Sequence, residues 1–243
     1  MSEIIVTQQF CGPPNSGNGG YVSGLMAAHI GGPVTAILRA IIPLDTPLDL
    51  TVDEAGAKLI SKDGVLIAEA RPAATGALPE PPAPPSLEQA RAAGGRFFAF
   101  ERSFHPICFT CGTGRPEGDG ARVFVGQIEG APKGHVAGVW TGHADFGDAD
   151  GLVRPEIVWA AVDCPGSVAW VEQLGHGGGL LGTMTGEILR RPKVGETCII
   201  TAWPMTLDGR KQFAGVAMFS AEGELLARGH QVWFSMRPRA EAA

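Results

Sequence analysis

Short runs of alternating apolar and polar residues, separated by turn-forming residues, run through most of the sequence. Residues 61–68 read SKDGVLIA and residues 220–227 read SAEGELLA. In both segments an acidic residue and a glycine separate an incoming strand from an outgoing one, which is typical of a β-hairpin. Residues 207–210, with the sequence LDGR, predict a third hairpin. The pattern therefore predicts antiparallel strands in both parts of the chain.

Two apolar segments predict helices. Residues 19–30 follow Asn18, a good N-cap residue, and stop at a Gly-Gly-Pro sequence. Residues 155–164 form the second segment, and Pro165 disfavours helical geometry at its end, so this helix should end or kink there. Further strands are predicted before the second helix, at residues 121–128 and 135–141. One apolar helix beside an antiparallel sheet is an α+β arrangement.

A proline-rich segment divides the chain. Residues 72–95 contain six prolines and few bulky apolar residues, which is typical of a semi-rigid linker. It separates an N-terminal unit, residues 1–71, from a C-terminal unit, residues 96–243. Because both units place a helix before hairpin-linked strands, we interpret them as a degenerate internal repeat. We expect their sheets to join edge to edge, which would cover edges that a small unit exposes.

Composition and charge narrow the possible functions. With 44% hydrophobic residues, 18% charged residues and a net charge of −6, the 243-residue chain is expected to be a globular protein that does not bind nucleic acid. No apolar run is long enough to span a membrane, and residues 1–10 lack the pattern of a signal peptide. The five cysteines are then expected to be reduced in the cytoplasm.

Three motifs carry a resemblance to a known family. Asn18-Gly19-Gly20, at the start of an apolar helix, looks like the His-Gly-Gly loop of phenylacetyl-CoA-type thioesterases, with Asn in place of His. Residues 108–112, CFTCG, followed by GDG at 118–120, resemble the segment that opens many hotdog thioesterases. Residues 154–163, RPEIVWAAVD, place Asp163 where that family carries its catalytic Asp.

The resemblance implies two fused hotdog domains, each a helix wrapped by an antiparallel sheet, and an acyl-CoA thioesterase activity. Two positions depart from the family pattern. Arg-Pro-Glu replaces His-Gly-Gly at 154–156, and Ala27 stands at the Asp position of the first unit. A complete site then requires Asn18, Gly19 and Gly20 from the first unit and Asp163 from the second. Family sites are likewise built across a two-fold axis between protomers.

The predicted chemistry needs a stabilised carbonyl oxygen and an activated water or nucleophile. The Gly20 amide at a helix N-terminus supplies the first, and Asp163 acts as general base or nucleophile. Asn18 as an ordinary N-cap, and Asp163 as a solvent-facing residue, are the structural alternatives. We expect the Asp163 charge to lie near a helix C-terminus, opposed by the helix dipole, with a pKa raised by burial.

The same hypothesis assigns substrate binding to four further residues. Tyr21 and Trp159 lie beside the predicted site residues, and Arg190 and Arg191, in the densest basic cluster, could meet CoA phosphates. No cofactor is expected other than CoA as part of the substrate. A hotdog hydratase or dehydratase and a non-catalytic acyl-CoA-binding module are the alternatives, and pairing of two chains into a homo-oligomer is left open.

A metal site is the last feature that the residues suggest. Cys108 and Cys111, together with His105, His135 and His143, are residue types that bind zinc. There is only one C-x-x-C pair, however, and no second pair at the spacing of a zinc ribbon. The sequence therefore favours a turn with packed thiols and no metal.

Overall fold

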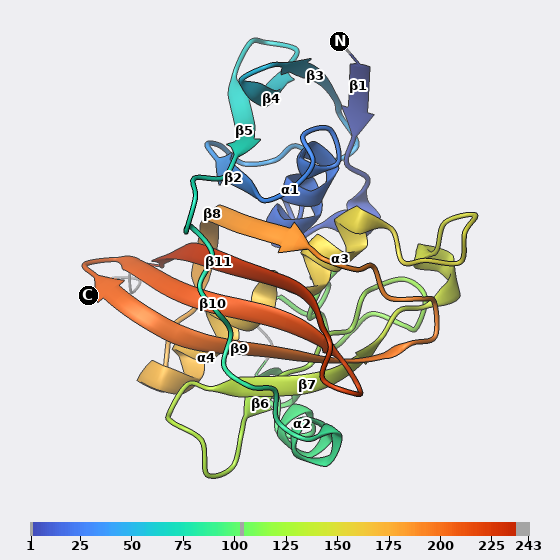
Figure 1. Ribbon diagram of the computed structural model, residues 1–243. Helices are drawn as coiled ribbons and strands as arrows, with labels where there is room; N and C mark the ends of the chain where they lie inside the picture. The colour runs from blue at the N-terminus through green and yellow to red at the C-terminus, as the bar shows by residue number, and fades with distance from the viewer. Residues whose placement is uncertain (1, 103–104, 237–243) are drawn as a thin grey trace.

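The computed structural model describes residues 2–102 and 105–236. Its strands form one continuous antiparallel sheet in the order β1-β3-β4-β5-β2-β8-β11-β10-β9-β7-β6 (Figure 1). The strands of the first half are β1 (Ser2–Ile5), β2 (Val34–Leu38), β3 (Pro47–Asp53), β4 (Gly56–Ser61) and β5 (Leu66–Pro72). Those of the second half are β6 (Gly126–Gln127), β7 (Val136–Thr141), β8 (Gly179–Ile188), β9 (Thr197–Asp208), β10 (Lys211–Ser220) and β11 (Leu225–Ser235).

The two halves meet where β2 pairs with β8. The pairing is antiparallel and runs from Val34 opposite Gly186 to Ile37 opposite Thr183. The hydroxyls of Thr35 and Thr185 hydrogen-bond across it at 2.9 Å. Backbone groups that each half alone would expose at this edge are paired with the other half. The prediction that the sheets join edge to edge is confirmed.

The three predicted hairpins are present. Residues 62–65 join β4 to β5, residues 221–224 join β10 to β11, and residues 209–210 join β9 to β10. Gly64 and Gly223, which occupy matching places in the first two turns, have φ of +86° and +90°. This backbone region is costly for residues with a Cβ, so the turn glycines of the sequence pattern are required by geometry.

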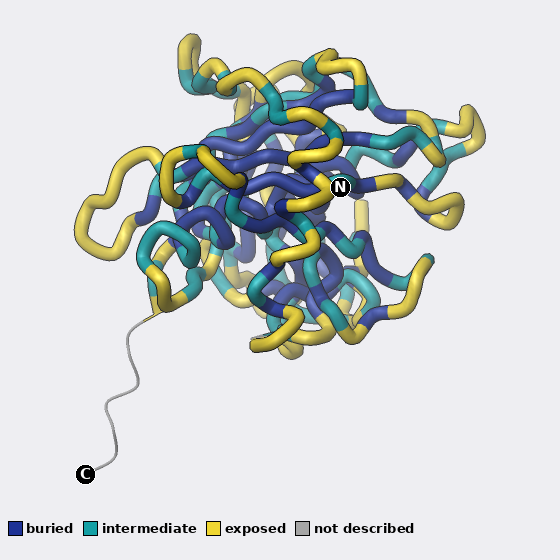
Figure 2. Tube along the Cα trace, turned by 90° about the horizontal axis from the view of Figure 1, so that it is seen from below, coloured by how far each residue is buried: buried dark blue, intermediate teal, exposed yellow. Residues whose placement is uncertain are grey.

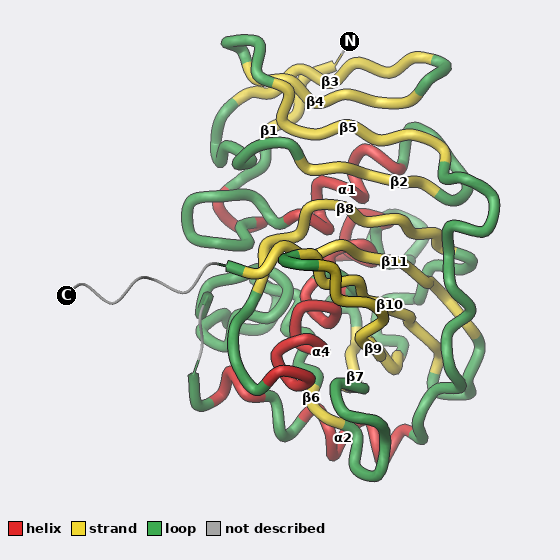
Figure 3. The backbone as a smooth tube through the Cα atoms, turned by 90° about the vertical axis from the view of Figure 1, so that its left-hand side faces the viewer, coloured by secondary structure: helices red, strands yellow, loops and turns green. Residues whose placement is uncertain are grey.

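The main helices lie on one face of the sheet (Figure 3), and the larger hydrophobic cluster extends through both halves. α1 belongs to the first half, and α3 and α4 to the second. α1 packs closely against α3, where a Cβ on Gly24 would lie 2.6 Å from the Cα of Glu156. The helices are α1 (Gly19–Ala27), α2 (Leu87–Gly94), α3 (Pro155–Ala161) and α4 (Cys164–Leu174), with short 3-10 turns η1 (Gln8–Phe10), η2 (Phe98–Phe100) and η3 (Ala144–Phe146).

The second half contains one helix more than the sequence predicted. α3 ends at Ala161, as the expected break near Asp163 requires, but a new helix, α4, starts at Cys164 and continues to Leu174. Pro165 therefore lies in the first turn of a helix, where its missing N–H costs nothing. The sequence predicted only the end of a helix at this proline, but the proline also lies at the beginning of the next helix.

The predicted linker, residues 72–95, is only partly a linker. Residues 73–86 run across the face of the second half's sheet opposite α4 (Figures 1 and 3), and Arg228 of β11 pairs with Glu80. α2 follows, with a capping box between Ser86 and Gln89. Its buried alanines, Ala90 and Ala93, belong to a second hydrophobic cluster with side chains from the sheet. This segment therefore covers the outer face of the sheet.

The predicted strand at 135–141 is present as β7, whereas the strand predicted at 121–128 is much shorter than expected. β6 contains only two residues, and residues 121–125 form an irregular segment held in part by the indole of Trp140, which donates to the Ala121 carbonyl at 2.8 Å. Exposed residues gather in the outer loops, and most strands and helices are buried (Figure 2). Within the described residues no helix combines the length and apolar character needed to cross a bilayer.

Candidate active site

The N-terminus of α1 is fixed by Asn18. Its side-chain oxygen accepts a hydrogen bond from the Tyr21 amide at 2.8 Å, as in an ordinary N-cap. Its side-chain nitrogen donates to the hydroxyl of Thr110 at 3.1 Å, and that hydroxyl donates to the Ala160 carbonyl of α3 at 2.8 Å. Asn18 is buried, with 1% of its surface exposed. The residue therefore caps its own helix and also ties α1 to α3.

Asp163 lies between α3 and α4, but its side chain reaches the other half. Its Oδ2 accepts a hydrogen bond from the Gly20 amide of α1 at 3.0 Å, and it does not cap α4. The residue is 2% exposed, and in the described structure its Oδ1 makes no hydrogen bond of standard geometry. The carboxylate from the second half and the glycine loop from the first are therefore in direct contact.

The electrostatic surroundings of Asp163 differ in part from the prediction. Burial raises the pKa of its carboxyl to about 7, and the Gly20 amide opposes this shift. As predicted, Asp163 lies just beyond the C-terminal end of α3, but α4, which was not predicted, begins at the next residue. The charge therefore lies at the N-terminal ends of both α1 and α4, where helix dipoles favour a negative charge.

Gln231 supports the break between α3 and α4, and sequence reasoning missed it. Its Nε2 donates to the carbonyls of Val162 and Asp163 at 2.8 and 3.0 Å, and its Oε1 accepts from the Trp233 indole at 2.8 Å. A Cβ on Gly166 would lie 1.9 Å from that Oε1, so α4 can approach only with a glycine there. The signal was a polar residue at an inward position of β11, where alternation places buried side chains.

A pocket of about 120 Å³ opens beside the carboxylate, between the α1 N-terminus and α4. Asn18, Gly19 and Asp163 line its polar side. The Gly19 amide, the first of α1, has no hydrogen-bond partner among residues 2–102 and 105–236. Apolar side chains line most of the remaining wall: Phe97, Phe98, Val168, Val171, Leu180, Leu181, Trp233 and Met236.

Tyr21 and Trp159, predicted to contact the substrate, are buried side chains that do not line this pocket. The Tyr21 ring stacks on Phe10, with centroids 4.0 Å apart, and burial raises its pKa to about 12. Trp159 fills the space beside Gly24 and Gly186. Both residues are close to predicted site residues along the chain, but their side chains are buried in the core.

Arg190 and Arg191 are also not brought to the pocket. Arg190 pairs with Glu196 and Glu224 at 2.8 Å, and Arg191 pairs with Asp148. Both follow the C-terminal end of β8, whereas the pocket is lined by the other end of that strand. A ten-residue strand spans roughly 30 Å, so these cations are far from the carboxylate.

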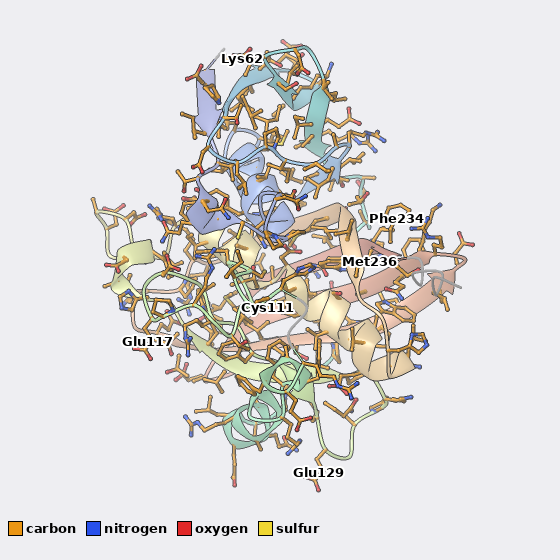
Figure 4. All side chains as sticks on the ribbon, turned by 180° about the vertical axis from the view of Figure 1, so that it is seen from behind. Lys62, Cys111, Glu117, Glu129, Phe234 and Met236 are labelled. Atoms are coloured by element: carbon orange, nitrogen blue, oxygen red, sulfur yellow. The ribbon has the colours of Figure 1, made fainter. Side chains whose placement is uncertain are left out.

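Three thiols converge on the wall of the same pocket. The Sγ atoms of Cys108, Cys111 and Cys164 lie within 4.8 Å of one another, and all five cysteines are free thiols. His105 also lines the pocket, whereas His135 and His143 do not. Cys164 is not among the metal-ligand candidates that the sequence suggests, because it is far from the C-x-x-C pair along the chain. Figure 4 labels Cys111 near the middle of the molecule, seen from behind.

Comparison with known proteins identifies the fold. No protein-family profile and no curated protein sequence matches this chain. Among solved structures, a candidate thioesterase from Novosphingobium aromaticivorans matches with a TM-score of 0.65 and 17% identity over 97% of this chain and 95% of its own. A candidate thioesterase II from Thermobifida fusca matches with a TM-score of 0.64 and 16% identity over 97% and 93%.

The tesB protein of Mycobacterium avium subspecies paratuberculosis matches with a TM-score of 0.61 and 17% identity, over 91% of this chain and 88% of its own. At these identities the likeness concerns the fold. The agreement over nearly the full length of each protein, with the edge-to-edge sheet, confirms the predicted α+β fold of two fused hotdog domains.

Proposed function

We propose that this protein is an acyl-CoA thioesterase whose site is shared between the two halves. The observation that carries the proposal is the contact between Asp163 of the second half and the Gly20 amide of the first, at 3.0 Å on the wall of a largely apolar pocket. Buried carboxylates beside helix N-termini in a pocket are typical of catalytic positions. The fold shared with named thioesterases supports the same reaction class.

The apolar wall suits an acyl chain, and the polar side suits the thioester. The Gly19 amide has no other partner and lines the pocket, so it is the better donor to the carbonyl oxygen. This modifies the prediction for Gly20, whose amide is engaged by Asp163. Gly20 acts by holding Oδ2 of the carboxylate, and the other oxygen, Oδ1, is buried without a standard hydrogen bond among the described residues and would accept from a water that enters from the pocket.

The reaction then follows from these positions. Asp163 takes a proton from a water molecule as the water oxygen attacks the thioester carbon. Negative charge develops on the carbonyl oxygen and is stabilised by the Gly19 amide and the N-terminal dipole of α1. Collapse of the tetrahedral intermediate breaks the carbon–sulfur bond, and the CoA thiolate leaves and takes up the proton.

The mirrored strand order of the two halves supports an origin from one repeated unit. Read from each outer side, the first half runs β1-β3-β4-β5-β2 and the second runs β7-β9-β10-β11-β8, with β6 added beyond β7. In such a pair each half can lose one part of a duplicated site. The first half keeps the glycine loop and the second keeps the carboxylate.

The test is a panel of acyl-CoAs that differ in chain length and aromatic character, with free CoA quantified by chromatography. Saturable release of CoA from at least one member is expected. An enoyl-CoA that gains water without losing CoA would identify the hydratase alternative. Saturable binding with all thioesters intact would identify the acyl-CoA-binding module, and either result would overturn the proposal.

A further inference from the structure

The three converging thiols come from two distant segments of the chain, the loop of Cys108 and Cys111 and the start of α4 at Cys164, and they form one compact group. Cys108 and Cys164 are 56 positions apart, and their Sγ atoms lie 3.6 Å from each other. A disulfide bond would need about 2.05 Å. Four sulfurs around a zinc ion at about 2.3 Å lie about 3.8 Å apart in a tetrahedron. The spacing between Cys108 and Cys164 is therefore close to the edge of a thiolate metal site, and all three sulfurs lie within 4.8 Å of one another.

The loop that carries Cys108 and Cys111 is folded tightly around the sulfurs. The Gly112 amide donates to the Cys108 carbonyl at 2.8 Å, closing the turn between the two cysteines. A Cβ on Gly112 would lie 2.5 Å from that carbonyl oxygen and 2.6 Å from the Pro106 oxygen, so only glycine fits. The turn therefore holds Cys108 and Cys111 close together on the wall of the pocket.

The contacts at the break between α3 and α4 hold the third thiol, Cys164, in place. Cys164 is the first residue of α4, where the helix dipole favours a thiolate. The preceding residue is fixed by its contact with the Gly20 amide and by the Gln231 side chain. The position of Cys164 relative to the C-x-x-C turn is therefore determined by contacts that do not involve sulfur.

We propose that Cys108, Cys111 and Cys164 bind one zinc ion, with the fourth coordination position facing the pocket. Thiolates are soft ligands that select zinc over magnesium or calcium, and three protein ligands with one open position are typical of zinc sites that exchange a ligand. All three cysteines line the pocket, so the open side is the side toward the pocket. The sequence alone favoured packed thiols without a metal, because it did not reveal that Cys164 lies beside Cys108 and Cys111.

The test uses full-length protein, purified with a thiol reductant and without chelators, and it needs no substrate. We expect about one zinc per chain by elemental analysis. Replacement by cobalt should give a thiolate-to-cobalt charge-transfer band and the intense visible bands of tetrahedral coordination. Absence of both in the reduced wild-type protein would overturn the proposal. Loss of two hydrogens from the intact mass, reversed by reduction and accompanied by no bound metal, would identify a disulfide and also overturn it.

A matched pair of variants assigns the ligands. Cys164→Ser should weaken cobalt binding by about 10-fold to 100-fold or more, on the scale of losing a site interaction. Cys198→Ser replaces a buried free cysteine on β9, outside the cluster, and should leave cobalt binding unchanged. Equal binding by wild type and Cys164→Ser would contradict the assignment, and it would do so whether or not thioesters are hydrolysed. If Cys164→Ser does not fold, the cobalt spectrum of the wild type decides.

Discussion

The two halves of the sheet share a strand order but differ in what their helices present. In the first half, α1 begins with Gly19, which lines the pocket, and Gly20, whose amide donates to Asp163, and its ninth residue is Ala27. In the second half, α3 begins with Arg-Pro-Glu, breaks after seven residues and presents Asp163 at the break. One half thus supplies hydrogen-bond donors, and the other supplies a buried carboxylate.

In the proposed function, this difference divides one site between two scaffolds that share a strand order. The α1 glycines allow α3 to approach closely, since a Cβ on Gly20 would lie 2.6 Å from the Asp163 Cβ. The break in the second half is possible because Gln231 satisfies the carbonyls that the interrupted helix leaves free. The close approach of α1 to α3 and the break between α3 and α4 are therefore complementary features of the two halves. Each can be tested separately.

The largest effect is expected from removing the carboxylate. Asp163→Asn keeps an oxygen that can accept from the Gly20 amide, so the fold should persist, but the side chain can no longer act as a base. Thioester turnover should fall by about 10²-fold or more, the scale for loss of a positioned acid-base group. The measurement is kcat on the best acyl-CoA substrate, with the thermal midpoint recorded in parallel.

Glu156→Gln is the matched control for this prediction. It removes a carboxylate from α3 that pairs with Arg154 and does not line the pocket. Its turnover should stay close to that of wild type. A wild-type rate in Asp163→Asn would exclude the carboxylate from the chemistry, and equal losses in both variants would indicate a general effect on α3.

A smaller effect, on stability alone, is expected at the contact between α1 and α3. A Cβ on Gly24 would meet the Glu156 Cα at 2.6 Å and the Trp159 Cβ at 2.8 Å, so Gly24→Ala must push the helices apart. We expect a loss of about 1–3 kcal/mol in the free energy of unfolding, despite the better helix propensity of alanine. Urea unfolding measures it.

Gly95→Ala serves as the comparison, because Gly95 has helical φ and its nearest neighbours would lie 3.6 Å from a new Cβ. That substitution should be neutral or slightly stabilising. If Gly24→Ala is equally neutral, the two helices are not in close contact, and the complementarity of the halves has been overestimated.

The repeated parts of the molecule were the most predictable from sequence. The Asp-Gly and Glu-Gly turns, the start of α1 at Asn18 and the helix break near Asp163 follow from local rules of hairpins, caps and helix breaks, whereas the resemblance to a family pointed to Asp163 as a site residue. These rules act within a few residues, so a single sequence reveals them. The joining of the sheets also followed, because small units with free edges have few other ways to cover them.

The parts that could not be predicted depend on contacts between distant segments. α4 was missed because Pro165 was taken as the end of a helix, and a proline fits equally well in a first turn. Cys164 and Gln231 reach the site only through the tertiary fold, and Arg190 and Arg191 were assigned by charge without regard to the length of β8. Residue type indicates chemistry, but only strand direction and register decide which residues meet.

The smallest effect is expected at the junction of the two halves, where β2 meets β8. Thr185→Val removes the hydroxyl that bonds Thr35 but keeps the side-chain shape and strand preference. Because Thr35 is only partly buried, water can replace the lost partner, and the free energy of unfolding should fall by about 1 kcal/mol. Thr183→Val, two residues earlier on β8, alters a hydroxyl with no side-chain hydrogen bond in the described structure and should cost less.

A double-mutant cycle that combines Thr185→Val with Thr35→Val then isolates the hydrogen bond across the junction. Zero coupling in this cycle would mean that backbone pairing and the shared core alone hold the halves together, whereas a measurable coupling would show that side chains on the two halves also recognise each other.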